Sequence, residues 1–221
     1  VLELPTISIA PYRAEELPEQ GAALEELESY QYLVFTSPSG VDCFFALLRE
    51  KKMDIRRFCA GKIAVIGAGT ASRLQNYGLM ADLMPEIYDA VHLGKCVGAD
   101  CKDGDRILIP RARLGSQALI EEIMAQKKVT IADLPIYDTI EKESPVVELP
   151  DLTKEEAMIV FTSASTVRGF RKMMADADIS RLQAVCIGAQ TKEAAEKAGF
   201  TNVCVAAEAT VDAIVSVIEE Q

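Results

Sequence analysis

Serine, threonine and glycine residues recur in four short loops of this chain, each directly after a run of apolar residues. Such loops commonly open a helix, where backbone N–H groups without intrahelical partners and nearby hydroxyls attract carboxylates and phosphates. The loops therefore predict a binding site for an anionic ligand. The candidate contacts are Ser37, Ser39, Gly67, Thr70, Ser163, Ser165, Gly188 and Thr191.

Two other interpretations of these loops stay open. A serine after a strand is usually an N-cap, which stabilises its helix by about 1 kcal/mol and does not exclude ligand binding. Residues 67–70 resemble the start of a dinucleotide-binding fingerprint, but Ser72 stands at the third glycine position. The matching loop at 188–191 keeps a single glycine, so the pattern is weak support for a nucleotide site.

Arg111 and Tyr137 complete the set of candidate functional residues. Arg111 follows the apolar run ILIP and could hold one carboxylate through two parallel hydrogen bonds; the alternative is an ordinary surface arginine. Tyr137 lies in the strand-like segment PIYDT, where a tyrosine is more often structural than catalytic.

Composition argues against several kinds of partner. The six cysteines show no C-x-x-C or metal-ligand spacing, so we expect buried thiols, no metal site and a reducing cytoplasm. His92 is expected to be an ordinary surface residue on a helix. The net charge of −11 argues against nucleic acid and anionic membranes. No apolar run reaches the ~18 residues of a membrane span, no signal peptide is visible, and we expect a monomer.

The four loops belong to two copies of one unit. The stretch LVFTSPSGV at 33–41 returns as IVFTSASTV at 159–167, at an offset of 126. Further on, IGAGT at 66–70 returns as IGAQT at 187–191, at an offset of 121. A self-similarity of this length indicates two copies of one α/β module.

Strands and helices alternate along most of the chain. Short apolar runs such as YLVF, IAVI and MIVF are typical of parallel strands buried on both faces, and the alternation predicts a doubly wound α/β fold. In this class, ligands bind beyond the carboxyl ends of the strands, where the four loops lie. The predicted strands span residues 32–36, 62–66, 79–84, 105–109, 129–137, 158–162, 184–187 and 202–206, and the predicted helices span 17–27, 38–50, 69–77, 88–98, 114–126, 164–175, 189–198 and 209–219.

The order of the copies predicts a circularly permuted pair of domains. Leu4-Pro5 recurs as Leu134-Pro135 at an offset of 130, which makes the strand-like run at 1–9 the end of a strand–helix–strand unit. Roughly 25 residues of strand and helix are then expected before Val1 and are taken to be omitted from this sequence. We expect domain 1 at 1–8 and 139–221, domain 2 at 12–135, and linkers at about 6–13 and 135–142.

The order, spacing and doubling of these motifs resemble the uroporphyrinogen-III synthase family over nearly the whole chain. The motifs are the two FTSxS loops, the two IGxxT loops, IPRAR at 109–113 and PIYDT at 135–139. The resemblance implies two α/β domains joined by a two-stranded linker, which open and close around the ligand. It also implies a hydro-lyase without a cofactor, which closes the linear, polyanionic tetrapyrrole hydroxymethylbilane with inversion of ring D and loss of water.

The same resemblance implies a role for Tyr137. This residue matches the tyrosine that assists departure of the substrate hydroxyl, as hydrogen-bond donor or general acid. Its phenol is neutral at pH 7 and can donate a proton, and loss of water leaves an azafulvene electrophile. Most of the catalysis is expected to come from positioning, so that ring D is attacked at its substituted carbon through a spiro intermediate.

Two other classes of function share this architecture. One is a two-domain binding protein that closes around a small molecule without chemistry. The other is a nucleotide-dependent oxidoreductase, because fold alone does not assign function. Turnover of hydroxymethylbilane to the type III rather than the type I ring separates the three.

Overall fold

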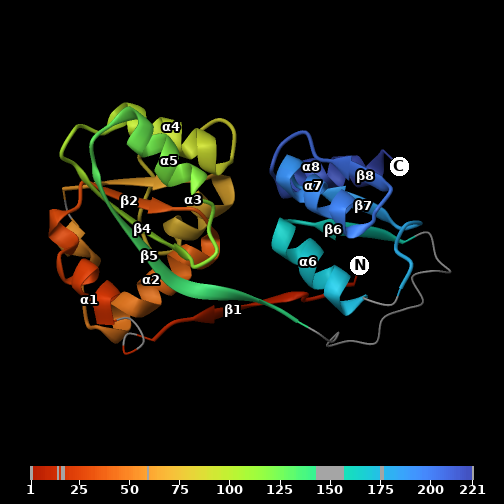
Figure 1. Cartoon of the computed structure of the whole chain (residues 1–221), viewed down its shortest axis with the longest axis horizontal. Coiled ribbons are helices and arrows are strands. Elements are labelled where there is room, and N and C mark those ends of the chain that lie inside the picture. Colours follow the sequence, from red (N-terminus) through yellow and green to blue (C-terminus); the bar gives the residue numbers. More distant parts are fainter. Residues whose placement is uncertain are drawn as a thin grey trace. The chain divides into compact units, whose positions relative to one another are not determined.

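The computed structural model of the chain divides into two compact units (Figure 1). Unit 1 comprises Val1–Ser8 and Thr139–Gln221, and unit 2 comprises Ile9–Asp138. Strands β1 (Ile7–Pro11) and β5 (Thr130–Glu141) each run across a boundary between the units. The structure describes residues 2–13, 15, 18–58, 60–142, 157–174 and 177–220.

Unit 2 is built on a five-stranded sheet in the order β1-β5-β4-β2-β3. Strand β4 pairs with β5 and β2, and β2 pairs with β3, all in parallel. Every residue of β2 is buried, as expected for a parallel strand that is covered on both faces. The three central strands are β2 (Tyr32–Phe35), β3 (Lys62–Val65) and β4 (Arg106–Ala112).

The side chains of β2 point alternately into two hydrophobic cores. Leu33 and Phe35 pack in a core with residues of α1, α2 and α3, whereas Tyr32 and Val34 pack in a core with residues of α4 and α5. This alternation follows the period of two of a strand and gives helices on both faces of the sheet. The helices are α1 (Pro18–Glu25), α2 (Pro38–Glu50), α3 (Ala68–Gln75), α4 (Ala90–Asp100) and α5 (Ala118–Gln126), with short 3-10 helices η2 (Leu27–Ser29) and η3 (Ile55–Phe58).

Unit 1 repeats this plan on a smaller scale. Its described residues form a parallel sheet in the order β6-β7-β8. Ala184 packs in a core with residues of α6 and α7, whereas its neighbour Val185 packs in a core with residues of α8. The predicted fold class of two doubly wound parallel sheets is confirmed. The elements are β6 (Met158–Phe161), α6 (Ala164–Met173), β7 (Gln183–Cys186), α7 (Ala189–Ala198), β8 (Asn202–Val205) and α8 (Val211–Glu219).

The sequence repeat has a counterpart in the packing. Phe35 and Phe44 meet edge to face with ring centroids 5.5 Å apart, and Phe161 and Phe170 do the same at 5.5 Å. A turn with a left-handed residue follows the second helix of each copy (α3 and α7), where only glycine avoids a steric penalty. The two glycines are Gly78 with a φ of 75° and Gly199 with a φ of 107°.

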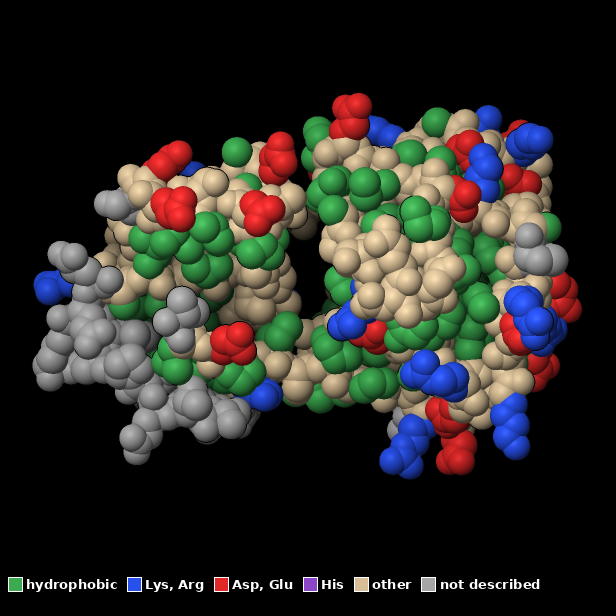
Figure 2. Space-filling view, turned by 180° about the vertical axis from the view of Figure 1, so that it is seen from behind, with side chains coloured by type: hydrophobic (Ala, Val, Ile, Leu, Met, Phe, Trp, Pro, Cys, Tyr) green, Lys and Arg blue, Asp and Glu red, His purple; other side chains and the backbone are tan. Residues whose placement is uncertain are grey.

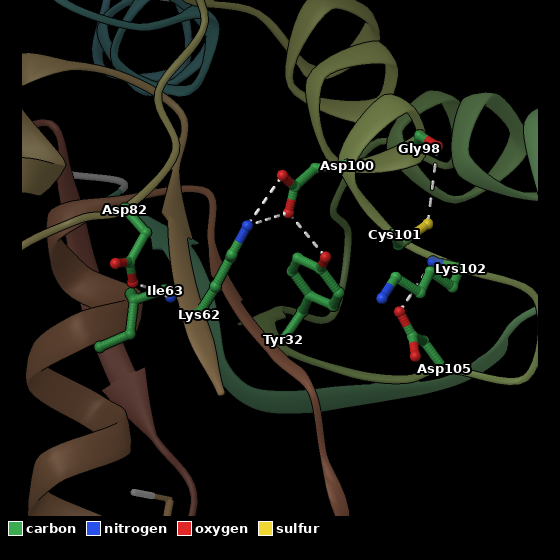
Figure 3. Close-up of polar contacts among 9 residues, drawn as sticks. All are labelled: Tyr32, Lys62, Ile63, Asp82, Gly98, Asp100, Cys101, Lys102 and Asp105. Carbon is green, nitrogen blue, oxygen red and sulfur yellow. Dashed lines mark hydrogen bonds and ion pairs between the residues drawn. The ribbon is translucent and has the colours of Figure 1, made fainter. Parts of the chain in front are cut away.

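Two predicted strands differ from the structure. The run at 1–9 becomes a strand only from Ile7 onward. The run at 79–84 is no strand, because only Leu83 forms an isolated parallel bridge, to Ala64. Here the carboxylate of Asp82 accepts the backbone N–H of Ile63 at 2.8 Å, so a side chain takes the place of a ladder hydrogen bond (Figure 3). Pro85 follows, and proline cannot donate to a ladder.

On the face of unit 2 that Figure 2 shows, charged side chains of both signs lie beside one another. Many of them are paired, for example Arg57 with Glu28 at 2.7 Å and Arg106 with Glu26 at 2.6 Å. Exposed pairs of this kind contribute about 0–1 kcal/mol each, so the stability of the unit rests on its two cores.

A polar cluster ties the amino ends of two strands to the end of α4 (Figure 3). The hydroxyl of Tyr32 donates to Asp100 at 2.6 Å, and the ammonium of Lys62 donates to the same carboxylate at 2.7 Å. The hydrogen bonds from Lys62 and Tyr32 hold the pKa of Asp100 below its ordinary value. This cluster lies at the opposite end of the strands from the candidate loops and has a structural role.

Replacing Asp100 with asparagine is expected to lower the free energy of unfolding at neutral pH by about 1–2 kcal/mol. Because the folded pKa of Asp100 is depressed, its contribution is present above the unfolded value of about 4 and is lost as the pH falls through the folded pKa. Urea unfolding at pH 7 and at pH values below about 4 measures the difference. Glu193→Gln, at an exposed pair with Lys197, is the control and should change little.

Candidate active site

Tyr137 and Ser37 form the centre of the candidate site in unit 2. Ser37 is the N-cap of α2, and its Oγ accepts the backbone N–H of Gly40 at 2.9 Å. The Oη of Tyr137, on β5, lies 2.7 Å from the same Oγ. Between Arg111 and Ala112 the register of β4 with β5 shifts, so that Tyr137 lies opposite Ala112. Such irregularities re-aim side chains at the end of a sheet.

Burial makes Tyr137 a neutral hydrogen-bond donor. Its side chain belongs to the core of unit 2, and the residue is 4% exposed. Burial raises the pKa of the phenol above its ordinary value, and the hydrogen bond with Ser37 offsets part of that rise. Either hydroxyl can donate in the pair. When Ser37 donates, the phenolic proton is left for a ligand.

Hydrogen bonds fix the backbone on either side of Tyr137, and they involve Arg113, Tyr12 and Asp138. The backbone N–H of Arg113 donates to the carbonyl of Tyr137 at 3.0 Å, and that of Tyr12 donates to the carbonyl of Ile136 at 2.9 Å. The guanidinium of Arg113 donates to Asp138 and to the hydroxyl of Tyr12. Sequence reasoning passed over these residues, although the second arginine of IPRAR was a signal for one of them.

Arg111 is not a surface arginine, so that interpretation was wrong. The residue is 2% exposed, and its Nε and Nη2 donate to the two carboxylate oxygens of Asp133 at 2.6 and 2.7 Å. Its Nη1 donates to the carbonyl of Ser116. The two parallel hydrogen bonds that the sequence assigned to a ligand carboxylate are therefore made to Asp133, within unit 2.

The glycine loop of unit 2 is covered by an aromatic ring. Gly67 is the N-cap of α3, and a Cβ on it would lie 2.6 Å from Cγ of Tyr88. Gly67 thus lets the loop pack closely against the tyrosine ring, because a side chain at this position would collide with it. Thr70 in the same loop is 2% exposed, and Ser39 on α2 is half-buried.

The loops of unit 1 are built in the same way but are more open. Ser163 caps α6 in a capping box with Thr166, and its Oγ lies 2.9 Å from the Oγ of Ser165. The capping role that the sequence predicts for serines after strands is confirmed at Ser37 and Ser163. Gly188 is the N-cap of α7, and a Cβ on it would meet nothing within 4 Å; Thr191, in the first turn, is buried.

The expectation of buried thiols is correct for Cys43, Cys101 and Cys186, whereas Cys96 and Cys204 are half-buried. Burial raises the pKa of Cys43 and of Cys186 to about 11, which makes both thiols unreactive. Cys59 lies outside the described residues. His92 lies 2.9 Å from Asp89, the N-cap of α4. The part of the chain that the structure describes holds no group of three His, Cys, Asp or Glu that could bind a metal, and none of its helices has the length and apolarity of a membrane span.

Known proteins match this chain over nearly its whole length. The family model described as uroporphyrinogen-III synthase HemD matches residues 1–216. The porphyrin biosynthesis protein HemD of Ruminiclostridium josui is 33% identical over 99% of this chain, which spans 43% of that relative. Uroporphyrinogen-III synthase of Chlorobaculum parvum is 26% identical, with 89% of this chain and 78% of the relative covered.

Solved structures show the same fold. Uroporphyrinogen-III synthetase of Helicobacter pylori superposes with a TM-score of 0.63 at 16% identity, over 97% of this chain and 90% of that chain. A mutant uroporphyrinogen III synthase of Thermus thermophilus gives 0.62 at 16% identity, over 99% and 88%. By its match to the family model and to these relatives, the chain belongs to the uroporphyrinogen-III synthase (HemD) family, the hydro-lyases of tetrapyrrole biosynthesis.

Proposed function

We propose that this chain closes hydroxymethylbilane to uroporphyrinogen III, with inversion of ring D and loss of water. Its place in the family supports the reaction, and one geometric observation supports the role of a residue in it. The Oη of Tyr137 lies 2.7 Å from the Oγ of Ser37, next to the amino end of α2. A neutral phenol beside the positive end of a helix suits a substrate that brings carboxylates and loses a hydroxyl.

Tyr137 acts on the departing hydroxyl. Its phenol gives a proton as the C–O bond breaks, and water leaves with the electron pair of that bond. The pyrrole nitrogen supplies electrons to the methylene carbon and then returns its own proton to the phenolate, which leaves a neutral azafulvene. Ring D then attacks through its substituted carbon, and rearrangement of the spiro intermediate inverts the ring. No electrons are gained or lost overall, so the proposed reaction needs no redox cofactor.

The helix starts of both units hold the substrate carboxylates in this proposal. Their N–H groups and hydroxyls are local donors, which act at short range despite the net charge of −11. Arg111 is left out of the set, because Asp133 already occupies its guanidinium. The proposed contacts are Ser37, Ser39, Gly67, Thr70, Ser163, Ser165, Gly188 and Thr191. We also expect the protein to act as a monomer in the cytoplasm.

Product analysis tests the proposal. Hydroxymethylbilane closes spontaneously to the type I ring, so the purified chain is expected to shift the product to the type III isomer, separated by chromatography after oxidation. Heat-inactivated protein is the control. Formation of the type I isomer alone by folded protein would sink the proposed function and leave the fold unaffected.

A further inference from the structure

Unit 1 contains a basic groove between α6, α7 and the end of β5. The groove has a volume of about 600 Å³, within the range of small-molecule sites. Four cationic and two acidic side chains line it, although the chain as a whole carries a net charge of −11. They are Arg168, Arg171, Lys172, Lys197, Glu141 and Glu193.

The internal repeat explains why this groove is hollow. In unit 2 the same crossing, between α2 and α3, is filled by Phe45 and Tyr77, whose rings stack with centroids 4.1 Å apart. At the repeat offsets of 126 and 121, Phe45 corresponds to Arg171 and Tyr77 to Ala198. Unit 1 therefore has a methyl group and a guanidinium where unit 2 has two packed rings, and Arg171 and Ala198 both line the groove.

The charged residues at this helix crossing also differ between the two units. In unit 2, Asp42 accepts a hydrogen bond from Tyr77 at 2.8 Å and pairs with Arg73 at 3.2 Å. The residues of unit 1 that correspond to Asp42 and Arg73 are Arg168 and Ala194. The crossing of α2 and α3 is thus filled and contains an ion pair, whereas the crossing of α6 and α7 is open and basic.

Two of the groove's cations, Arg168 and Lys197, form exposed ion pairs. Arg168 pairs with Glu141 at 3.0 Å, and Lys197 pairs with Glu193 at 2.6 Å, all with side chains at least 32% exposed. Exposed ion pairs are weak, so a ligand carboxylate can exchange for the internal one at little cost. Arg171 is positioned differently, because its Nη1 donates to the carbonyls of Met174 and Ala177 just beyond α6.

We propose that this groove binds a ligand that carries several carboxylates. If the proposed function holds, that ligand is the tetrapyrrole, and the groove receives part of its acidic rim. The groove reaches the first turn of α7, since Gln190 lines it and follows the open N-cap Gly188 by two residues. The helix start and the cations then bind carboxylates of the same molecule, which raises affinity without taking part in the chemistry.

Charge reversal in the groove tests this inference. Uroporphyrin is a stable fluorescent probe with the same carboxylate side chains as the expected product. The double variant Arg168→Glu with Lys197→Glu is expected to weaken its binding at least about tenfold and to raise KM for hydroxymethylbilane. Lys192→Glu is the matched control, because Lys192 lies on α7 with an exposed side chain outside the groove lining; its Kd should stay within about twofold.

Filling the groove is an independent test. Ala198→Tyr places a ring where unit 2 has Tyr77 and is expected to weaken probe binding while every charge remains. Wild-type affinity in both the filled and the reversed variant, with unchanged Tm, overturns the inference and leaves the proposed function standing. Groove-dependent probe binding by a protein that forms only the type I ring supports the groove and removes the proposed function.

Discussion

Replacing Asp133 with alanine is expected to destabilise unit 2 by about 3–5 kcal/mol, toward the lower end because water reaches this carboxylate. The substitution leaves the guanidinium of Arg111 inside the unit, 2% exposed, without the two oxygens that now accept from it at 2.6 and 2.7 Å. Only the carbonyl of Ser116 remains as a described acceptor. Thermal unfolding should show a fall in Tm of roughly 10 °C or more.

Asp54→Ala is the matched control for this experiment. Asp54 pairs with Arg56, whose side chain is 87% exposed, so removal of its carboxylate leaves a cation that water solvates. The expected change in Tm is small beside that of the Asp133 variant. A loss of similar size at Asp133, accompanied by weaker substrate binding, would contradict the structural role of Arg111 and return it to the predicted ligand contacts.

Features that depend on neighbouring residues were predictable from the sequence. The apolar runs YLVF and MIVF predict parallel strands, and both form them. Only YLVF is buried throughout, however, since Val160 in MIVF is 42% exposed. A serine at the point where such a run gives way to a helix predicts the N-caps Ser37 and Ser163, because its hydroxyl reaches an N–H only three residues away. The repeat then extends each inference from one copy to the other.

Features that depend on distant partners were not predictable in the same way. Arg111 meets Asp133 only because the register of β4 and β5 places them together, and the sequence carries no sign of that pairing. Tyr88, which packs over Gly67, lies in the segment between α3 and α4, so the whole of α3 separates the two residues in the sequence. The run at 79–84 has strand-like composition, but the side chain of Asp82 competes for the backbone donor that a ladder needs.

The groove of unit 1 could not be predicted from the sequence for a different reason. Ala198 is the last residue of α7, whereas Tyr77, at the equivalent position of the repeat, lies two residues beyond the end of α3. Whether the space between the helices is filled depends on both partners of the crossing at once. A change from two rings to alanine and arginine leaves the alternation of strands and helices intact, so that alternation alone does not reveal a cavity.

Replacing Tyr137 with phenylalanine is expected to lower kcat roughly 10- to 100-fold while KM changes little. General acids contribute about 10²- to 10⁴-fold. Because the hydroxyl of the substrate leaves readily from an electron-rich pyrrole, we expect a loss at or below the lower end of that range. Phenylalanine keeps the ring in the core of unit 2 and removes only the hydroxyl that lies 2.7 Å from Ser37. Steady-state kinetics with the product isomers resolved measures the change; an unaltered kcat would contradict the proton-donor role.

A double-mutant cycle of Ser37 and Tyr137 separates the two roles of Ser37, which are to orient the phenol of Tyr137 and to stabilise α2. Ser37→Ala removes the N-cap of α2, which should cost about 1 kcal/mol, and also removes the oxygen that orients the phenol. Its effect on kcat should disappear in the Tyr137→Phe background, whereas its effect on stability should remain.

The pH dependence of kcat gives a further check on the role of Tyr137. Because burial raises the pKa of Tyr137, the donating form persists across about pH 6–9, and the tyrosine-dependent part of kcat should fall only above about pH 10.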